Sequence, residues 1–129
     1  MNPPYAGWDS NLALNLIRDG SSNTIAFGTR LGHCAGNGTL WAHGGWTPQW
    51  MAMFAITNNP ATVPLFQVYP TEPACNPDLA HALSPAGMPV GLADASVRFL
   101  DPAISQSTWA AVLNPGDGVS LPADWTGGS

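Results

Sequence analysis

The hydrophobic pattern is clearest in the last third of the chain, where residues 90–93 and 96–100 both read as strands. Only Asp94 and Ala95 separate these two runs, and a connection of two residues is typical of a tight β-hairpin. Such turns need positive φ at their central positions, which alanine adopts with difficulty. We therefore predict an antiparallel hairpin that turns at Asp94 and Ala95.

A short helix is predicted directly after this hairpin. Ser105 or Ser107 can cap its N-terminus, and it is expected to run to Leu113, before an Asn-Pro-Gly sequence that stops it. Trp109, Val112 and Leu113 would share one face of this helix. The rest of the chain is expected to be a polar, glycine-rich tail.

The first two thirds of the chain give weaker signals. Residues 24–30 read as a strand, and Asn37-Gly38 is a type I′ turn signal that would fold this strand back along 39–43. Residues 65–69 look like another short strand, whereas 70–89 contain five prolines and are expected to be irregular. Together these segments predict an α+β fold with a mainly antiparallel sheet and a short C-terminal helix.

The composition fits one domain over residues 1–129, because 45% of the residues are apolar and can form a core. Only 9% are charged, lysine is absent and the net charge is −5. Nucleic-acid binding is not expected, since affinity for phosphate comes from lysine and arginine clusters. No apolar run approaches the roughly 20 residues of a membrane span, and no signal peptide is visible at the start. The low charge and two cysteines favour an extracytoplasmic location, in the cell envelope or secreted.

Cys34 and Cys75 are the two cysteines of the chain, and three interpretations of them are open. A disulfide between them would stabilise the fold by about 4 kcal/mol in the chain-entropy model. Two free thiols are the second interpretation. A zinc site would recruit His33, His43 and His81, but these residues lack paired ligand spacing. We predict the disulfide, with no metal and no cofactor.

Catalysis is not predicted, because the chain contains no nucleophile-elbow sequence of the G-x-S-x-G type. Exposed tryptophans suggest carbohydrate binding as an alternative function, with Trp46 and Trp50 the best candidates in a loop-like context. The apolar stretch 46–56 would either contact a protein partner or pack into the core of the domain. Its candidate partner-binding residues are Trp46, Trp50, Met51, Met53 and Phe54.

Several segments occur in an order that resembles one family. Asp-Gly-Ser-Ser-Asn-Thr-Ile at 19–25 precedes Gly-Thr-Arg at 28–30, and Ala-Cys-Asn-Pro at 74–77 precedes a stretch at 84–99 that ends in Ser-Val-Arg-Phe. Ile-Ser, Thr-Trp, Gly-Asp-Gly and Asp-Trp sequences close the series by residue 125. This series resembles the planctomycete pilin-like proteins, also described as general-secretion-pathway-G-like, whose C-terminal domain of unknown function carries an H-x9-D-G signature.

The resemblance covers residues 3–125 and implies a non-enzymatic, pilin-like or pseudopilin-like subunit that assembles with other such subunits or with envelope proteins. The family's N-terminal peptidase site and long apolar helix do not occur in this chain, which looks like the C-terminal globular part. Ser84 and Ala95 stand where the signature has His and Gly. The positions carried over as structural motif residues are Asp19, Gly20, Ser22, Asn23, Thr24, Asp94, Arg98 and Trp109.

The segment from Asp19 to Asn23 is predicted to be a structural turn. Asp and Asn side chains bond readily to backbone amides two or three residues further on, which would fix the start of the following strand. The functional alternative is a cation site in which Asp19 is one of the oxygen ligands.

Overall fold

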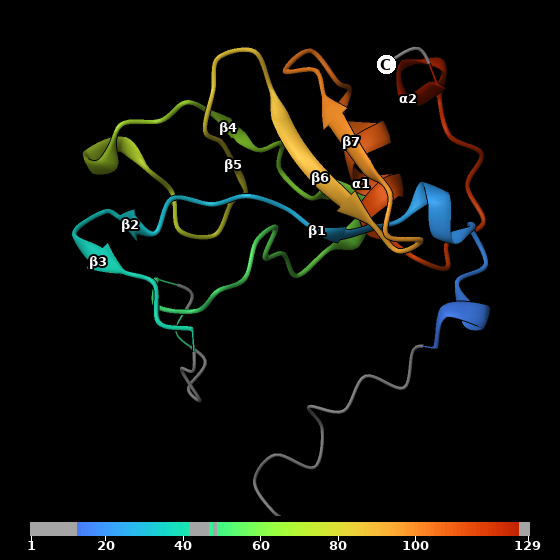
Figure 1. The fold of residues 1–129 in the computed structure, drawn as a ribbon, viewed down its shortest axis with the longest axis horizontal. Helices are drawn as coiled ribbons and strands as arrows, with labels where there is room; N and C mark the ends of the chain where they lie inside the picture. The colour runs from blue at the N-terminus through green and yellow to red at the C-terminus, as the bar shows by residue number, and fades with distance from the viewer. Residues whose placement is uncertain (1–12, 42–46, 48, 127–129) are drawn as a thin grey trace, which may run out of the picture.

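A three-stranded antiparallel sheet forms the centre of the domain (Figure 1). The computed structural model describes residues 13–41, 47 and 49–126 of the chain. Strand β6 (Met88–Leu92) lies in the middle of the sheet, between β1 (Ile25–Phe27) and β7 (Val97–Leu100). Both pairings are antiparallel. The predicted α+β class, with a mainly antiparallel sheet and a short helix near the C-terminus, is confirmed.

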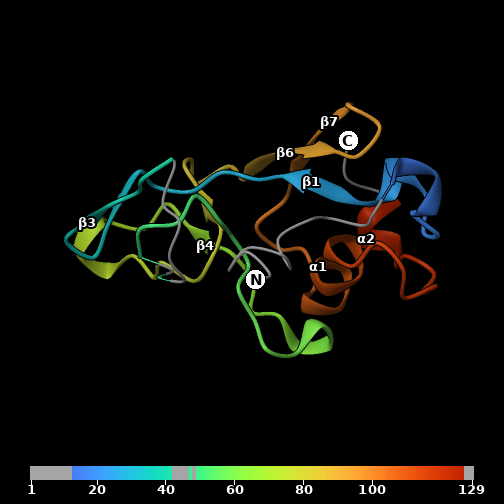
Figure 2. The ribbon, with the colours of Figure 1, turned by 90° about the horizontal axis from the view of Figure 1, so that it is seen from below.

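Helix α1 (Gln106–Leu113) covers one face of this sheet, as Figure 2 shows. The predicted cap is Ser105, whose side chain accepts a hydrogen bond from the Thr108 amide. Trp109 of α1 is fully buried in the core, and its indole Nε1 donates to Pro64 O at 2.9 Å. The core between helix and sheet also contains Met88, Val90, Leu92, Leu100 and Val112.

The hairpin between β6 and β7 is confirmed, but its loop has three residues where two were predicted. Leu92 N donates to Ser96 O at 2.8 Å, and Ala95 N donates to Leu92 O at 3.0 Å. The loop is thus a turn followed by Ala95 in the left-handed region, with φ of 68°. Asp94 Oδ1 accepts a bond from Ser96 N at 2.9 Å and closes the loop.

Replacing Ala95 with glycine should raise the free energy of unfolding by about 0.5–1 kcal/mol. The Ala95 side chain is exposed, so the change removes no core contact, and glycine adopts positive φ without steric cost. Urea denaturation measures the change. Ala93→Gly, in the same loop but without positive φ, should lower stability instead. Equal or lower stability of Ala95→Gly would contradict this explanation.

A β-bulge in β1 turns Phe27 away from α1. Ile25 pairs with Leu92 and Phe27 pairs with Gly91, so β1 has one residue more than β6 between these pairs. Ile25 consequently points into the core, whereas Phe27 is 73% exposed on the other face. Gly91 leaves space for the Phe27 ring, because a Cβ at this position would lie 3.3 Å from it.

Four shorter strands lie on the left in Figure 1, on the side of the three-stranded sheet that is away from α2. β2 (His33–Cys34) and β3 (Asn37–Gly38) form an antiparallel pair. β4 (Gln67–Val68) and β5 (His81–Ala82) form a parallel pair. The stretch 70–89 was predicted to be irregular, but it contains all of β5 and the first two residues of β6.

The turn between β2 and β3 corrects the predicted hairpin. Ala35 and Gly36 are the turn residues, with φ of 51° and 81°, and Asn37-Gly38 is strand rather than turn. Glu72 explains the position of the turn, because its backbone oxygen accepts from Ala35 N at 3.1 Å and its Oε1 accepts from Gly36 N at 2.6 Å. A turn with two residues of positive φ was predicted, but it was placed at Asn37-Gly38, two residues after its actual position at Ala35-Gly36.

Short helical turns complete the described structure. They are the 3-10 turns η1 (Leu14–Leu16), η2 (Ser21–Asn23), η3 (Pro60–Thr62) and η4 (Glu72–Ala74), and the single α-helical turn α2 (Ala123–Thr126). Within the described ranges, every helix falls short of the length and apolar character that crossing a membrane requires.

Candidate functional site

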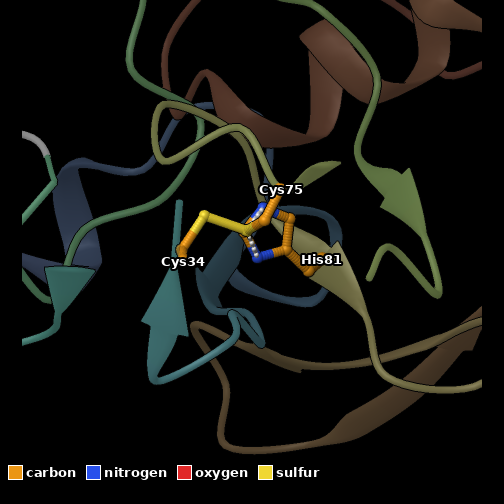
Figure 3. Close-up of side chains that lie close together, drawn as sticks. All are labelled: Cys34, Cys75 and His81. Carbon is orange, nitrogen blue, oxygen red and sulfur yellow. Dashed lines mark hydrogen bonds between the residues drawn. A yellow bond between two sulfur atoms is a disulfide. The ribbon is translucent and has the colours of Figure 1, made fainter. Parts of the chain in front are cut away.

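A buried disulfide with a histidine packed against it is the most chemically distinctive cluster of the domain (Figure 3). Cys34 in β2 and Cys75 after η4 are bonded, with an Sγ–Sγ distance of 1.99 Å, which confirms the predicted pairing. The imidazole of His81 lies beside them, with Nε2 at 3.3 Å and Nδ1 at 3.7 Å from Cys75 Sγ. His81 is fully buried.

Backbone groups set the protonation state of His81. Leu31 N donates to Nδ1 at 3.0 Å, so Nδ1 carries a lone pair, and Nε2 donates to Asn76 O at 2.9 Å. The imidazole is therefore neutral, with its proton on Nε2. Burial lowers the pKa of His81; the Asn76 carbonyl opposes this effect and the nearby Arg30 charge reinforces it.

His81 also joins β5 to the segment that follows β1. Its backbone N donates to Thr29 O at 2.9 Å, and its backbone O accepts from Thr29 Oγ1 at 2.7 Å. With the bond from Leu31, three hydrogen bonds hold these two segments together at one residue. Sequence reasoning considered His81 only as a zinc ligand, and no local pattern marks it as a buried structural group.

The cluster is not arranged to bind a metal ion. The ligand atoms of Cys34, Cys75 and His81 lie within 4.8 Å of one another. Zinc, however, takes thiolates, and these two sulfurs are bonded to each other, while both ring nitrogens face backbone partners. His33 is exposed and lies 3.0 Å from Glu72, and His43 is outside the described residues.

Stability should fall as the pH is lowered from about 6.5 to 5, because the unfolded chain protonates His81 while the folded domain keeps it neutral. Because the pKa of His81 is lower in the folded domain, the unfolded state binds more protons between these pH values. Acid therefore lowers the free energy of unfolding. The slope should not exceed about 1.4 kcal/mol per pH unit. Denaturant titrations at several pH values measure it. A His81→Gln variant should lose this slope, and an unchanged slope would contradict the assignment.

The motif residues at 19–24 join the N-terminal part of the domain to a C-terminal loop. The Asp19 carboxylate accepts from Asp117 N at 3.1 Å and from Gly118 N at 2.9 Å. Asn23 Nδ2 donates to Asp19 O at 3.1 Å, and Thr24 Oγ1 donates to Gly20 O at 3.2 Å. Both carboxylate oxygens of Asp19 thus bind backbone amides, which favours the structural turn over a cation site.

Trp125 is where three motif segments meet. Its indole Nε1 donates to Asn23 Oδ1 at 3.2 Å, and the Arg98 guanidinium lies 4.2 Å from the centroid of its ring. Arg98 Nη1 also donates to Trp125 O at 2.6 Å. Trp125 is buried on the last helical turn, so the prediction of a polar tail is wrong at this position. The Asp-Trp sequence was the available signal for this contact.

The β6–β7 loop is attached to the turn at residues 19–24 by backbone hydrogen bonds. Asp94 N donates to Ser21 O at 3.1 Å and Ala93 N donates to Thr24 O at 2.9 Å, which attaches the hairpin loop to the 19–24 turn. Gly20 has φ of 89°, and Ser22 is exposed. Ser84, at the position of the signature histidine, lies before β6 and Asp94 lies after it, at opposite ends of the strand.

In the described part of the stretch 46–56, residues 47 and 49–56, the candidate partner-binding side chains are buried to different degrees. Met51 is buried and bridges to Leu40, and Met53 and Phe54 are half-buried, with Phe54 packed against the core. The Arg30 guanidinium contacts this segment by donating to the carbonyl oxygens of Met51 and Met53. Trp50 is exposed, and Trp46 lies outside the described residues.

A group of exposed apolar side chains lies on the sheet face opposite α1. We call it the outer sheet face and define it by Phe27, Pro89, Val97 and Phe99. Val97 is 78% and Phe99 is 49% exposed, and Phe27 stands beside them because of the bulge in β1. Within the described residues, no helix or strand covers this face (Figure 2). The domain therefore presents uncharged aromatic and aliphatic side chains on a three-stranded sheet.

Comparisons with known proteins do not assign this domain. No protein-family model matches the chain, and neither a characterised protein nor a solved structure shows significant similarity to it. The resemblance to pilin-like proteins is therefore limited to the series of short motifs between residues 19 and 125.

Proposed function

We propose that this chain is a non-enzymatic, pilin-like domain that assembles through its outer sheet face. Exposure of Phe27, Val97 and Phe99 on one face of the sheet carries the proposal. Contiguous apolar patches on soluble domains mark interaction sites, and aromatic residues are enriched at the centres of interfaces. Among the described elements, α1 covers the opposite face of the same sheet, and no helix or strand covers the outer sheet face.

The partner that we propose is a second copy of this chain. With a net charge of −5, two copies repel each other over most of their surface. The outer sheet face has no charged residue among its four defining side chains, so it is where two copies can approach closely. Two such faces can pack as aligned sheets about 10 Å apart.

The disulfide indicates an oxidising compartment, since buried structural disulfides are rare in the cytosol. We place the domain in the cell envelope as part of a filament or a secretion apparatus. The motif series at 19–30 and 84–99 supports this finer assignment.

Cysteine cross-linking tests the assembly surface. Val97→Cys places a thiol in the outer sheet face, and Val119→Cys places one at an exposed valine outside it. Under mild oxidation, Val97→Cys should form covalent dimers several-fold more efficiently than Val119→Cys. Adding Phe27→Ser should abolish the excess. Equal cross-linking of the two variants, together with a monomer at high concentration, would overturn the proposal.

Carbohydrate binding is the second candidate, and one observation favours it. Trp41 is 93% exposed and Trp50 is exposed nearby in the chain, so indole surface is available for stacking on sugar rings. Tryptophan fluorescence titration with oligosaccharides tests this function. A saturable change that Trp41→Ala removes would support it, and no change with a panel of oligosaccharides would reject it.

A further inference from the structure

Strand β7 lies at one edge of the central sheet, and one side of its backbone faces away from β6 (Figure 1). Leu92 N donates to Ser96 O, so Ser96 turns its backbone groups toward β6. The direction alternates along an antiparallel strand, so Arg98 also turns its N–H and C=O toward β6. Val97 and Phe99 therefore turn their N–H and C=O groups outward, to the free edge of the sheet.

The positions of two other residues agree with this alternation. The Leu100 carbonyl oxygen lies on the β6 side, because a Cβ on Gly87, which directly precedes β6, would be 2.1 Å from it. Pro89, which has no N–H, pairs with Phe99, where the ladder between β6 and β7 needs no donor. Among the described residues, no bond from outside the ladder reaches the outward groups of Val97 and Phe99.

This edge lacks the features by which sheets usually avoid joining to other sheets. Natural edge strands are blunted by bulges, prolines or charged side chains, most often lysine. The register of β7 with β6 is regular, and the strand Val97–Leu100 includes neither proline nor lysine. Its one charged side chain, Arg98, is held by Trp125. The other edge strand, β1, is interrupted by its bulge. Of the two edges, β7 is therefore the one suited to add a strand.

We propose that β7 pairs antiparallel with β7 of a second copy of this chain, so that two sheets join into one. The inference rests on the proposed function, because it takes the same partner, but it uses a different contact. A row of outward N–H and C=O groups is complementary to another extended backbone. A second copy presents the same row, so one two-fold axis satisfies both edges.

One register pairs all of the outward groups. When Val97 lies opposite Phe99 of the second copy, the two-fold axis places Phe99 opposite Val97 of that copy. Each of these pairs then exchanges both of its backbone hydrogen bonds. Arg98 lies opposite Arg98 of the second copy in this register, and each guanidinium remains over Trp125 of its own chain.

Pairing at this edge also makes the outer sheet faces of the two copies continuous. Val97 and Phe99 project to the same side of the sheet, and residues opposite each other in an antiparallel pair share a face. A contact between two outer sheet faces ends at a dimer when it is the sole contact, because it is isologous. The β7 edge supplies the second contact that a larger assembly needs.

Amide hydrogen exchange of the wild-type chain, measured by NMR at low and high protein concentration, tests the pairing. We expect the Val97 and Phe99 amides to exchange rapidly in dilute solution and roughly tenfold more slowly, or slower still, in concentrated solution. The Arg98 and Leu100 amides, which bond to β6, are the matched control and should exchange slowly at both concentrations. Stacking of outer sheet faces leaves the edge amides without acceptors, so it does not produce this change.

Two results of the exchange measurement would overturn the inference. One is an exchange rate of Val97 and Phe99 that does not depend on concentration. The other is slow exchange of these two amides in the monomer, because another segment of the same chain would then cover the edge.

Two variants separate the edge contact from the outer sheet face. Val97→Pro removes an outward N–H, keeps an apolar side chain and leaves the bonds to β6 in place. Phe27→Ser weakens the outer sheet face at β1, on the other side of the sheet. In sedimentation velocity, the wild type should form species larger than a dimer, and each variant should stop at a dimer.

The failures of the two proposals are distinguishable in this experiment. A folded Val97→Pro variant that assembles like the wild type overturns the edge contact and leaves the outer sheet face in place. A Phe27→Ser variant that assembles like the wild type has the opposite meaning. Far-UV circular dichroism shows whether Val97→Pro folds, and the exchange measurement on the wild type decides the edge contact if it does not.

Discussion

Replacing Gly87 with alanine should lower the free energy of unfolding by about 3 kcal/mol or more. Gly87 directly precedes β6 and has φ of 141°, a conformation that side chains rarely adopt. A Cβ at this position would lie 2.1 Å from Leu100 O and 2.7 Å from the Phe99 ring. Leu100 pairs with Met88, so its backbone cannot retreat without breaking the central ladder of the sheet.

Urea denaturation, followed by tryptophan fluorescence, measures this loss. Gly116→Ala is the matched control, because a Cβ there meets nothing within 4 Å and φ is not positive. The control should remain within about 0.5 kcal/mol of the wild type. A loss below about 1 kcal/mol for Gly87→Ala would show that β7 can move at this position, which would contradict the steric explanation.

Removing the disulfide with the double variant Cys34→Ala, Cys75→Ala should cost about 4 kcal/mol of stability. The cysteines are 41 positions apart, so the bond restricts a large part of the unfolded chain. The denaturant slope, the m-value, should increase at the same time, because the unfolded chain without the bond is more expanded. His81 would also lose the sulfur against which it packs.

The double variant also removes two sulfur atoms from the core. Denaturation of the wild type with and without a reducing agent is the control, because it breaks the disulfide without changing the side chains. Reduction and double substitution should produce similar losses if the covalent constraint dominates. A loss of less than about 1 kcal/mol in both experiments would mean that packing around Cys34 and Cys75 holds the segments together without the bond.

Local signals were sufficient for the C-terminal part of the fold. The hairpin follows from two apolar runs separated by turn residues, and α1 follows from Ser105 as a cap and from the spacing of Trp109 and Val112. In these segments, neighbouring residues supply most of the partners. The hairpin loop is longer by one residue than predicted, because Ala95 takes the positive φ that a glycine would signal. The tail was predicted to be polar throughout, yet Trp125 is buried, because its partners Asn23 and Arg98 are distant in the chain.

Elsewhere the partners are distant in the chain, and the sequence alone could not identify them. The β2–β3 turn is placed by Glu72, which follows it by more than thirty residues. The β1 bulge that exposes Phe27 depends on its register with Gly91, and no periodicity reports a bulge. The disulfide was predictable because only two cysteines exist, but the packing of His81 against it was not.

The contacts of Trp125 impose an order of events on the making of this domain. Asn23 is synthesised 102 positions before Trp125, whose indole binds it. Asp19 is synthesised 99 positions before Gly118, whose amide donates to its carboxylate. A chain that emerges from its N-terminus, whether from a ribosome or through an export channel, therefore cannot close this side of the domain until its last helical turn is free. Until then Arg98 and Asn23 lack Trp125, which is their partner in the folded domain. The emerging chain must therefore avoid aggregation while this side of the domain is still open.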